Sequence, residues 1–213
     1  MSYAAFTFNA ESASNADKEG GRIQKTGKYI GKIKFIEFFT AKSGSQGLEI
    51  FFKSDSNEET SLQVYTHKAD GTPIDFQCNK INAMMACLKT KSLTPEVVTI
   101  DKYDFDLKKE VPKQTTIAKE VKDKDIGFLL QAEEYLNSNH EVKTKMTLFS
   151  SFEASTGFMA KEILERKTTP EALEKKYARL MQIGDKKLTE SQSSGGGYGG
   201  VPQVIDQDDD LPF

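Results

Sequence analysis

The strongest constraint on the fold is an alternation of apolar and polar side chains with a period of two, which recurs three times. It is found in KYIGKIKFIEFF at 28–39, in LEIFFKS at 48–54 and in SLQVYTH at 61–67. Short polar stretches, AKSGSQG and SDSNEE, separate the three segments. A period of two is typical of strands that bury one face. Three such strands joined by short turns predict an antiparallel meander.

The pattern changes after the third strand. Four apolar residues at helical spacing in CNKINAMMACLKT predict a helix over 78–90. PEVVTIDKYDFDL predicts a further strand over 95–107. The stretch 108–124 is rich in lysine and contains Pro112, so we expect a loop there.

The last part of the domain combines a hairpin with two helices. DIGFLLQAEEYL and EVKTKMTLFSSF flank the turn residues NSNH, which predicts a second hairpin over 125–152. STGFMAKEILER and TPEALEKKYARLMQI predict helices over 155–166 and 169–183. In the second helix we expect Thr169 to be the N-cap and Pro170 to occupy the first turn.

These elements predict a mainly β fold with helical additions and three regions along the chain. Residues 1–21 are small and polar, and we expect a flexible N-terminus. Residues 22–188 form one β-rich domain with C-terminal helices, for which 14 Phe and 7 Tyr supply core material. Residues 189–213 form a disordered Gly/Ser linker that ends in an acidic tip.

Several function classes lack support in the sequence. There are two histidines, and no phosphate-binding glycine loop or nucleophile elbow is present, so we expect no enzyme and no cofactor. Cys78 and Cys87 do not have zinc-ligand spacing, so we expect no metal site. Nothing resembles a signal peptide or a membrane span, which favours a cytoplasmic protein with reduced thiols.

The distribution of charge is more informative than its sum of −3. Residues 22–53 carry seven Lys and Arg against two Glu, whereas four Asp stand among the last eight residues. If the apolar side of each strand points inward, aromatic and basic side chains alternate outside, as single-stranded nucleic acid requires for stacking and phosphate contact. The alternative to nucleic-acid binding is that the phenylalanines are buried and the lysines are ordinary solvated groups. The predicted DNA-binding residues are Lys32, Lys34, Phe38, Phe51, Lys53, Tyr65, Lys143, Lys145 and Phe149.

The chain ends in DQDDDLPF, which closely resembles the C-terminal tip of bacterial single-stranded DNA-binding proteins. Leu211 stands where isoleucine is commoner in that family. The resemblance implies that the terminal ring enters an apolar pocket on a partner, with basic residues receiving the aspartates. It therefore implies recruitment of replication and repair proteins by the tip. The residues that carry it are Asp208, Asp209, Asp210, Leu211, Pro212 and Phe213.

The body of the chain, from TGKYIGKIKFIEFFTAKSGSQGLEIFFKSD to SFEASTGFMAKEIL, resembles single-stranded DNA-binding proteins of bacteriophages. That family implies an antiparallel OB-type barrel with extra elements and sequence-tolerant binding of single-stranded DNA in viral replication, recombination or repair. Two other function classes stay open. One is an interaction adaptor that does not bind DNA, and the other is an RNA-binding or nucleic-acid-modifying accessory factor.

Overall fold

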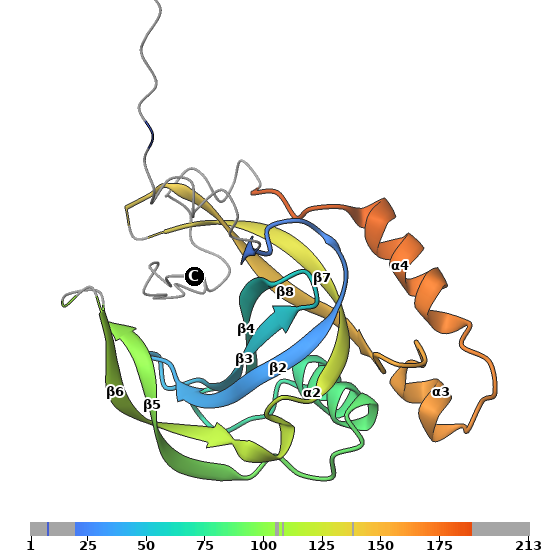
Figure 1. The fold of residues 1–213 in the computed structure, drawn as a ribbon, viewed down its shortest axis with the longest axis horizontal. Helices are drawn as coiled ribbons and strands as arrows, with labels where there is room; N and C mark the ends of the chain where they lie inside the picture. Colours follow the sequence, from blue (N-terminus) through green and yellow to red (C-terminus); the bar gives the residue numbers. More distant parts are fainter. Residues whose placement is uncertain (1–7, 9–19, 105–106, 108, 138, 189–213) are drawn as a thin grey trace, which may run out of the picture.

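The computed structural model describes Phe8 and residues 20–188, apart from 105, 106, 108 and 138. Within this part of the chain, eight strands form one strongly curled sheet with helices packed beside it (Figure 1). The expected linker and acidic tip, 189–213, lie outside the described residues, as does nearly all of the expected flexible N-terminus. The mainly β fold with helical additions is thus confirmed.

The predicted meander forms one part of the sheet. β2 (Gly27–Thr40) pairs antiparallel with β3 (Gln46–Ser54), and β3 pairs antiparallel with β4 (Glu58–His67). The two-residue strand β1 (Gly21–Arg22) lies parallel to β4 at the edge. The three strands expected from the alternation are therefore confirmed.

The other edge of β2 is shared by two hairpins that pair with different halves of the strand. β7 pairs with residues 27–32, whereas β6 pairs only with Ile36 and Glu37. Because both hairpins need the same edge, the sheet splits there into two arms. In Figure 1, the β5–β6 arm extends to the lower left and the β7–β8 arm curves over the top. The hairpins are β5 (Pro95–Asp104) with β6 (Lys109–Ala118), and β7 (Asp125–Leu136) with β8 (Val142–Phe152).

An irregularity in β2 lies between those two halves. The register with β3 shifts between Ile33 and Phe35, so Lys34 is the extra residue of a bulge. Ile33 and Ile36 are both fully buried although they stand three positions apart. Inward and outward positions are therefore exchanged beyond the bulge, and the strict alternation predicted over 28–39 holds only for its first half.

β2 and β3 approach each other closely at Gly31. At Gly31, a Cβ atom would lie 2.1 Å from the carbonyl oxygen of Lys53 and 2.6 Å from the Cα of Ser54. Both neighbours are backbone atoms that cannot move without breaking the pairing of β2 with β3. Glycine is thus required at this point of the β2–β3 pairing.

The main core lies inside the curl. α2 (Asp75–Cys87) packs against β8 and β4, and buries Met84 completely. The rings of Phe52 and Phe128 meet edge to face with centroids 5.0 Å apart. The helix thus covers the opening between two strands that do not pair with each other. Other core residues are Ile33, Ile36, Ile50, Leu62, Leu130, Met146 and Leu148.

A second, smaller cluster lies on the outer side of β7 and β8. It joins Leu129 and Phe152 to Leu173 and Leu180 of α4 (Ala172–Ile183). Lys28 of β2 forms an ion pair with Glu174 at 2.8 Å, which ties the same helix to the sheet. In Figure 1, α4 and the short α3 (Ala160–Leu164) stand at the right of the curled sheet, away from the β5–β6 arm.

The prediction of a loop over 108–124 is wrong. The chain forms β6 there, followed by the 3₁₀ turn Lys119–Val121. Pro112 is tolerated because it pairs with Asp101 of β5, while β6 meets β2 only at Ile117 and Ala118. At Pro112 the strand has a free edge, where a missing N–H breaks no ladder bond.

The predicted helices are all present, but their bounds differ. α2 spans 75–87 rather than 78–90. The helix expected over 155–166 is reduced to α3 (Ala160–Leu164), because Gly157 has φ of 77° and Met159 bridges back to Phe152. The last helix begins after Glu171, and Thr169 is not its N-cap.

The cap of α4 comes instead from a side chain of α3. The carboxylate of Glu162 is buried and accepts hydrogen bonds from the backbone N–H groups of Met159, Glu171 and Ala172 at 3.0, 2.8 and 2.9 Å. Burial alone would raise the pKa of Glu162, but these three donors outweigh it and the pKa lies below its ordinary value. One carboxylate thus satisfies the first turns of two helices.

We expect Glu162→Gln to lower the free energy of unfolding by about 1–3 kcal/mol, because the amide nitrogen faces donors that lose an acceptor. Because the folded-state pKa of Glu162 is lowered, its ionised carboxylate stabilises the fold at pH values above the unfolded pKa of about 4.3. This stabilisation is lost as the pH falls through the folded-state pKa. Urea titrations at several pH values measure both effects. Glu165→Gln, directly after the same helix, is the control, since Glu165 is exposed. Equal unfolding curves for the two variants would contradict the assigned role.

Candidate nucleic-acid interface

Four aromatic side chains line the outward face of β2, β3 and β4. Phe35 stacks on Phe51 with ring centroids 4.3 Å apart and an interplanar angle of 26°. Phe39 meets Tyr65 edge to face at 5.2 Å. All four are half-buried. We call these four residues the aromatic face.

The register of the strands explains this arrangement. Phe35 lies directly opposite Phe51 across the β2–β3 ladder, so the two rings share one side of the sheet. Phe39 lies opposite Gly47, and a Cβ at Gly47 would come within 2.7 Å of its ring. Tyr65 is the partner of Gly47 on β4. The glycine thus provides the room in which the second aromatic pair forms.

Two glutamates lie between the aromatic pairs. Glu37 and Glu49 are opposite each other on β2 and β3. Glu37 accepts hydrogen bonds from Lys102 and Thr115. Burial raises the pKa of Glu49, and the neighbouring Glu37 adds to the shift. Burial and Glu49 likewise raise the pKa of Tyr65. The middle of this face therefore carries acidic groups, one of which is paired with Lys102.

The contacts of Glu37 also show how the β5–β6 arm is placed. Lys102 belongs to β5 and Thr115 to β6, and both reach the outward side of β2. The arm therefore curls toward the aromatic face and forms a wall beside it. Figure 1 shows this arm standing apart from β7 and β8, and β6 does not pair with β7.

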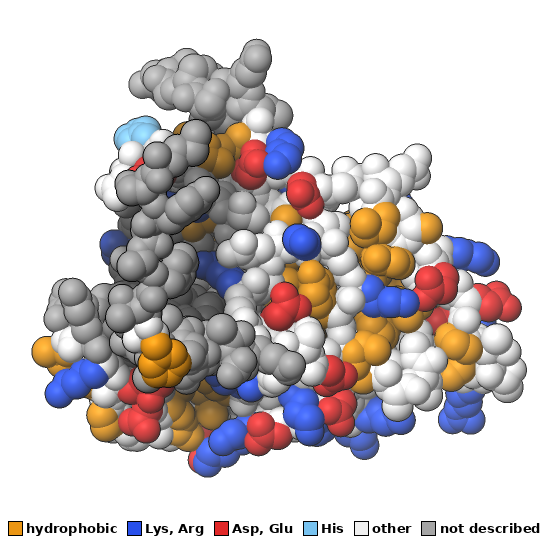
Figure 2. Space-filling view, turned by 45° about the horizontal axis from the view of Figure 1, so that its top comes forward, with side chains coloured by type: hydrophobic (Ala, Val, Ile, Leu, Met, Phe, Trp, Pro, Cys, Tyr) orange, Lys and Arg blue, Asp and Glu red, His pale blue; other side chains and the backbone are white. Residues whose placement is uncertain are grey.

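Three predicted lysines lie at one end of the aromatic face, and all three are exposed. Lys34 pairs with Glu59 at 2.8 Å and Lys32 with Asp125 at 3.6 Å. Lys53 lies opposite Lys32 on β3, and no residue of the described part of the chain forms an ion pair with it. An exposed ion pair such as Lys32–Asp125 contributes about 0–1 kcal/mol, so a phosphate can replace that carboxylate at little cost. Figure 2 shows basic and acidic side chains interspersed over the visible surface.

The other predicted residues of β8 lie in a different region. Lys143, Lys145 and Phe149 belong to β8, and Phe149 packs against the smaller cluster that includes α4. Lys32 is opposite Asp125 and Lys145 is opposite Glu133, eight residues further along β7. At about 3.4 Å per residue this separation is roughly 27 Å. The predicted residues therefore do not form one continuous site.

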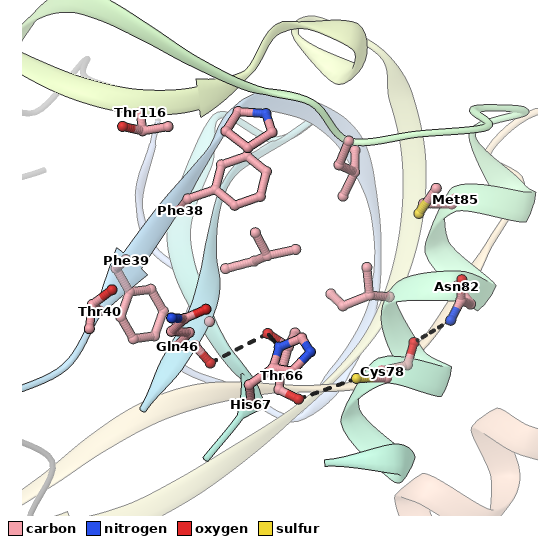
Figure 3. Close-up of a pocket in the computed structure, with 15 residues that line it drawn as sticks. Phe38, Phe39, Thr40, Gln46, Thr66, His67, Cys78, Asn82, Met85 and Thr116 are labelled. Carbon is pink, nitrogen blue, oxygen red and sulfur yellow. Dashed lines mark hydrogen bonds between the residues drawn. The ribbon is translucent and has the colours of Figure 1, made fainter. Parts of the chain in front are cut away.

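Phe38 was expected to point outward with Phe51, and this is wrong. Because of the bulge, its ring points inward, packs against the main core and lines a cavity of about 670 Å³ at the end of the barrel (Figure 3). Met85, Asn82 and Cys78 face this cavity from α2. Its apolar lining also includes Leu48, Ile81, Leu93 and Pro95.

The described residues include histidines, cysteines and many acidic side chains. Among them, no group of three or more His, Cys, Asp or Glu could hold a metal ion. Cys78 and Cys87 are free thiols, and burial raises the pKa of Cys87 to about 12, so it stays protonated. None of the helices described is long and apolar enough to cross a membrane.

The sequence analysis missed Phe35, Phe39 and Lys102. A signal for the first two is present in FIEFF, where apolar residues fall on both sides of the strand and no single buried face accounts for them. The position of Lys102 depends on the curl of β5 and β6, which were not expected to pair. No local pattern reports that contact.

Comparison with known proteins leaves the family undetermined. No protein-family model matches the chain, and no curated protein matches it.

The raised pKa of Glu49 predicts an opposite pH effect from that of Glu162. A folded-state pKa above the unfolded value of about 4.3 means that stability increases as pH falls through the folded pKa and levels off below the unfolded one. We expect Glu49→Gln to increase the free energy of unfolding at pH 7 and to remove this gain. Urea denaturation between pH 4 and 7 measures it, with exposed Glu110→Gln as the control. A loss of stability at pH 7 would show that the ionised carboxylate is required.

Proposed function

We propose that this protein binds single-stranded DNA with little sequence preference through the aromatic face. The observation that carries the proposal is the pair of aromatic contacts on the half-buried outward face of the sheet, with Lys32, Lys34 and Lys53 at one end. Ring faces stack on unpaired bases of any identity, and ammonium groups follow the phosphates. The protein acts by binding, without a cofactor and without catalysis.

The strand connections support an OB-type barrel for the body of this domain. β2 pairs with β3 on one edge and β7 on the other, β4 follows β3, and β8 follows β7. α2 packs against both β4 and β8, where a five-stranded barrel of this type is partly open. In this assignment, β5 and β6 are an addition. OB folds bind oligonucleotides on the face of their second and third strands, which correspond to β3 and β4.

The acids on the aromatic face favour single strands over duplexes. Glu37 and Glu49 lie between the aromatic pairs, where a base can stack but a phosphate is repelled. A single strand can turn its bases to the rings and its phosphates to the lysines at the edge. A duplex presents phosphates on its outside and cannot avoid the glutamates. Single-stranded RNA offers the same bases and phosphates to this face, and an adaptor that binds protein is the alternative from another class.

We expect Phe51→Ala to weaken binding of an oligothymidylate by about 1–3 kcal/mol, because one base loses its stacking partner. Phe38→Ala is the matched comparison, since Phe38 points inward. Truncating a core phenylalanine costs about 3–5 kcal/mol of folding free energy, and we expect the lower part of that range for half-buried Phe38. Fluorescence anisotropy and thermal melting measure the two effects.

Three ligands separate the candidate functions in that experiment: oligothymidylate, an RNA of equal length and a duplex of equal length. Binding to neither single strand would refute the proposal and favour the adaptor. If Phe38→Ala and Phe51→Ala lose the same affinity while both proteins are folded, the aromatic face is not the surface that binds DNA.

We further propose that residues 208–213 recruit replication and repair proteins in the cytoplasm of a bacterial host of a phage. The proposal rests on the sequence of the tip, since these residues lie outside the described part of the chain. The aspartates attract a basic partner at long range, and the terminal ring then fixes the position. The 17 residues 189–205 form a Gly/Ser-rich linker whose reach is about 20–25 Å.

The acidic tip is expected to compete with DNA for basic groups of its own domain. Deleting residues 206–213 should tighten binding of oligothymidylate at low salt, and the gain should fade as salt screens the attraction. Phe213→Ala should leave this affinity nearly unchanged, because the aspartates remain, yet abolish retention of partner proteins. Unchanged affinity of the deletion variant at low salt would exclude the competition.

A further inference from the structure

A second basic region lies outside the aromatic face. It consists of Lys80 of α2, Lys145 of β8, Lys176 of α4 and Lys186, which follows α4. We call these four residues the lysine cluster. The side chain of Glu133 lies among them and pairs with Lys186 at 2.7 Å. The cluster therefore carries four positive charges against one negative charge.

Each of three lysines in this cluster lies over an aromatic ring. The Nζ of Lys145 is 5.4 Å from the ring centroid of Tyr135, and the Nζ of Lys176 is 5.5 Å from that of Phe149. The Nζ of Lys80 is 5.8 Å from the centroid of Phe76. Ring faces hold the ammonium groups in place without neutralising them.

The electrostatic environment of this cluster is unfavourable in the free protein. Burial lowers the pKa of Lys80, and Lys176 and Lys186 lower it further despite the opposing effect of Glu133. Burial and Lys186 likewise lower the pKa of Lys145. Lys80 also donates a hydrogen bond to the carbonyl oxygen of Leu148 at 2.6 Å, which fixes its head group. A bound anion would relieve this repulsion.

The chemistry around the cluster favours nucleic acid as the anion. Phe76 is 62% exposed although it is a large aromatic residue, and it lies on α2 one turn before Lys80. An exposed ring beside a lysine offers both a stacking surface and a phosphate contact. An acidic peptide would need the lysines but has no use for the ring faces beneath them.

We propose that the lysine cluster binds phosphates of the same single strand that lies on the aromatic face. This inference rests on the proposed function and extends it with a second contact region on α2, β8 and α4. The two regions are separated by roughly 27 Å along β7, at about 3.4 Å per residue. A short oligonucleotide can fill only one of them, whereas a longer one can reach both.

The test compares oligothymidylates at the two ends of the range for one OB-type domain, about 4 and about 16 nucleotides. The variant is the full-length protein with Lys80→Gln, Lys145→Gln and Lys176→Gln, which removes charge but keeps donors. Loss of three phosphate contacts should reduce the slope of log affinity against log salt by about 2 for the long oligonucleotide, at about 0.7 per phosphate. The short one should bind with unchanged affinity.

The control variant is Lys175→Gln, because Lys175 is the exposed neighbour of Lys176 on the same helix. Thermal melting checks that every protein is folded. If the triple variant binds the long oligonucleotide like the control, the inference is overturned. Binding of the short oligonucleotide in the same experiment would show that the proposed function itself still holds. An increase in the affinity of the triple variant for DNA would also overturn the inference, and would indicate that the cluster binds the acidic tip instead of DNA. Failure of wild type to bind either length would instead refute the proposed function.

Acetylation footprinting adds a measurement that does not depend on substitutions. The long oligonucleotide should protect Lys80 and Lys176 from an acetylating reagent, whereas Lys175 should react as before. The short oligonucleotide should not protect Lys176. If it protects Lys176 but neither Lys32 nor Lys34, the primary site is the lysine cluster, which contradicts the proposed order of the two regions.

Discussion

The bulge at Lys34 is the feature on which the rest of the domain depends. It exchanges the two sides of β2, so Ile33 and Ile36 are both buried and Phe35 and Phe39 face outward. It also divides the free edge of the strand between β6 and β7. A regular strand would bury Phe35 and leave Ile36 outside, and the paired aromatic rings would not form. The fold and the candidate site therefore have one structural cause.

The two candidate contact regions combine aromatic rings and cations in different ways. On the aromatic face, the glutamates between the rings are hydrogen-bonded or carry a raised pKa, and the lysines stand at the edge. In the lysine cluster, ammonium groups lie directly over rings, and Glu133 is the acidic group among them. A ligand with alternating bases and phosphates satisfies both arrangements. This is the physical reason for preferring a single-stranded nucleic acid to a peptide.

Much of the architecture follows from local pattern, and the exceptions have identifiable causes. The meander and the second hairpin are visible as alternation, because each strand buries one face. The bulge is not visible, since one extra residue leaves the composition of the strand unchanged, and Phe38 was therefore placed on the wrong side. The strand at 109–118 was missed because Pro112 suggests a loop unless its free edge is known. The cap supplied by Glu162 joins residues nine and ten positions apart, which no N-cap pattern describes.

The most direct test of this account is photo-cross-linking of an oligothymidylate to the full-length protein, with the modified residues identified by mass spectrometry. Stacked bases cross-link to the rings that they contact, so the account predicts adducts on Phe35, Phe39, Phe51 or Tyr65. It also predicts none on Phe38, whose ring points into the barrel. Adducts confined to residues outside both the aromatic face and the lysine cluster would contradict the assignment of the binding surface.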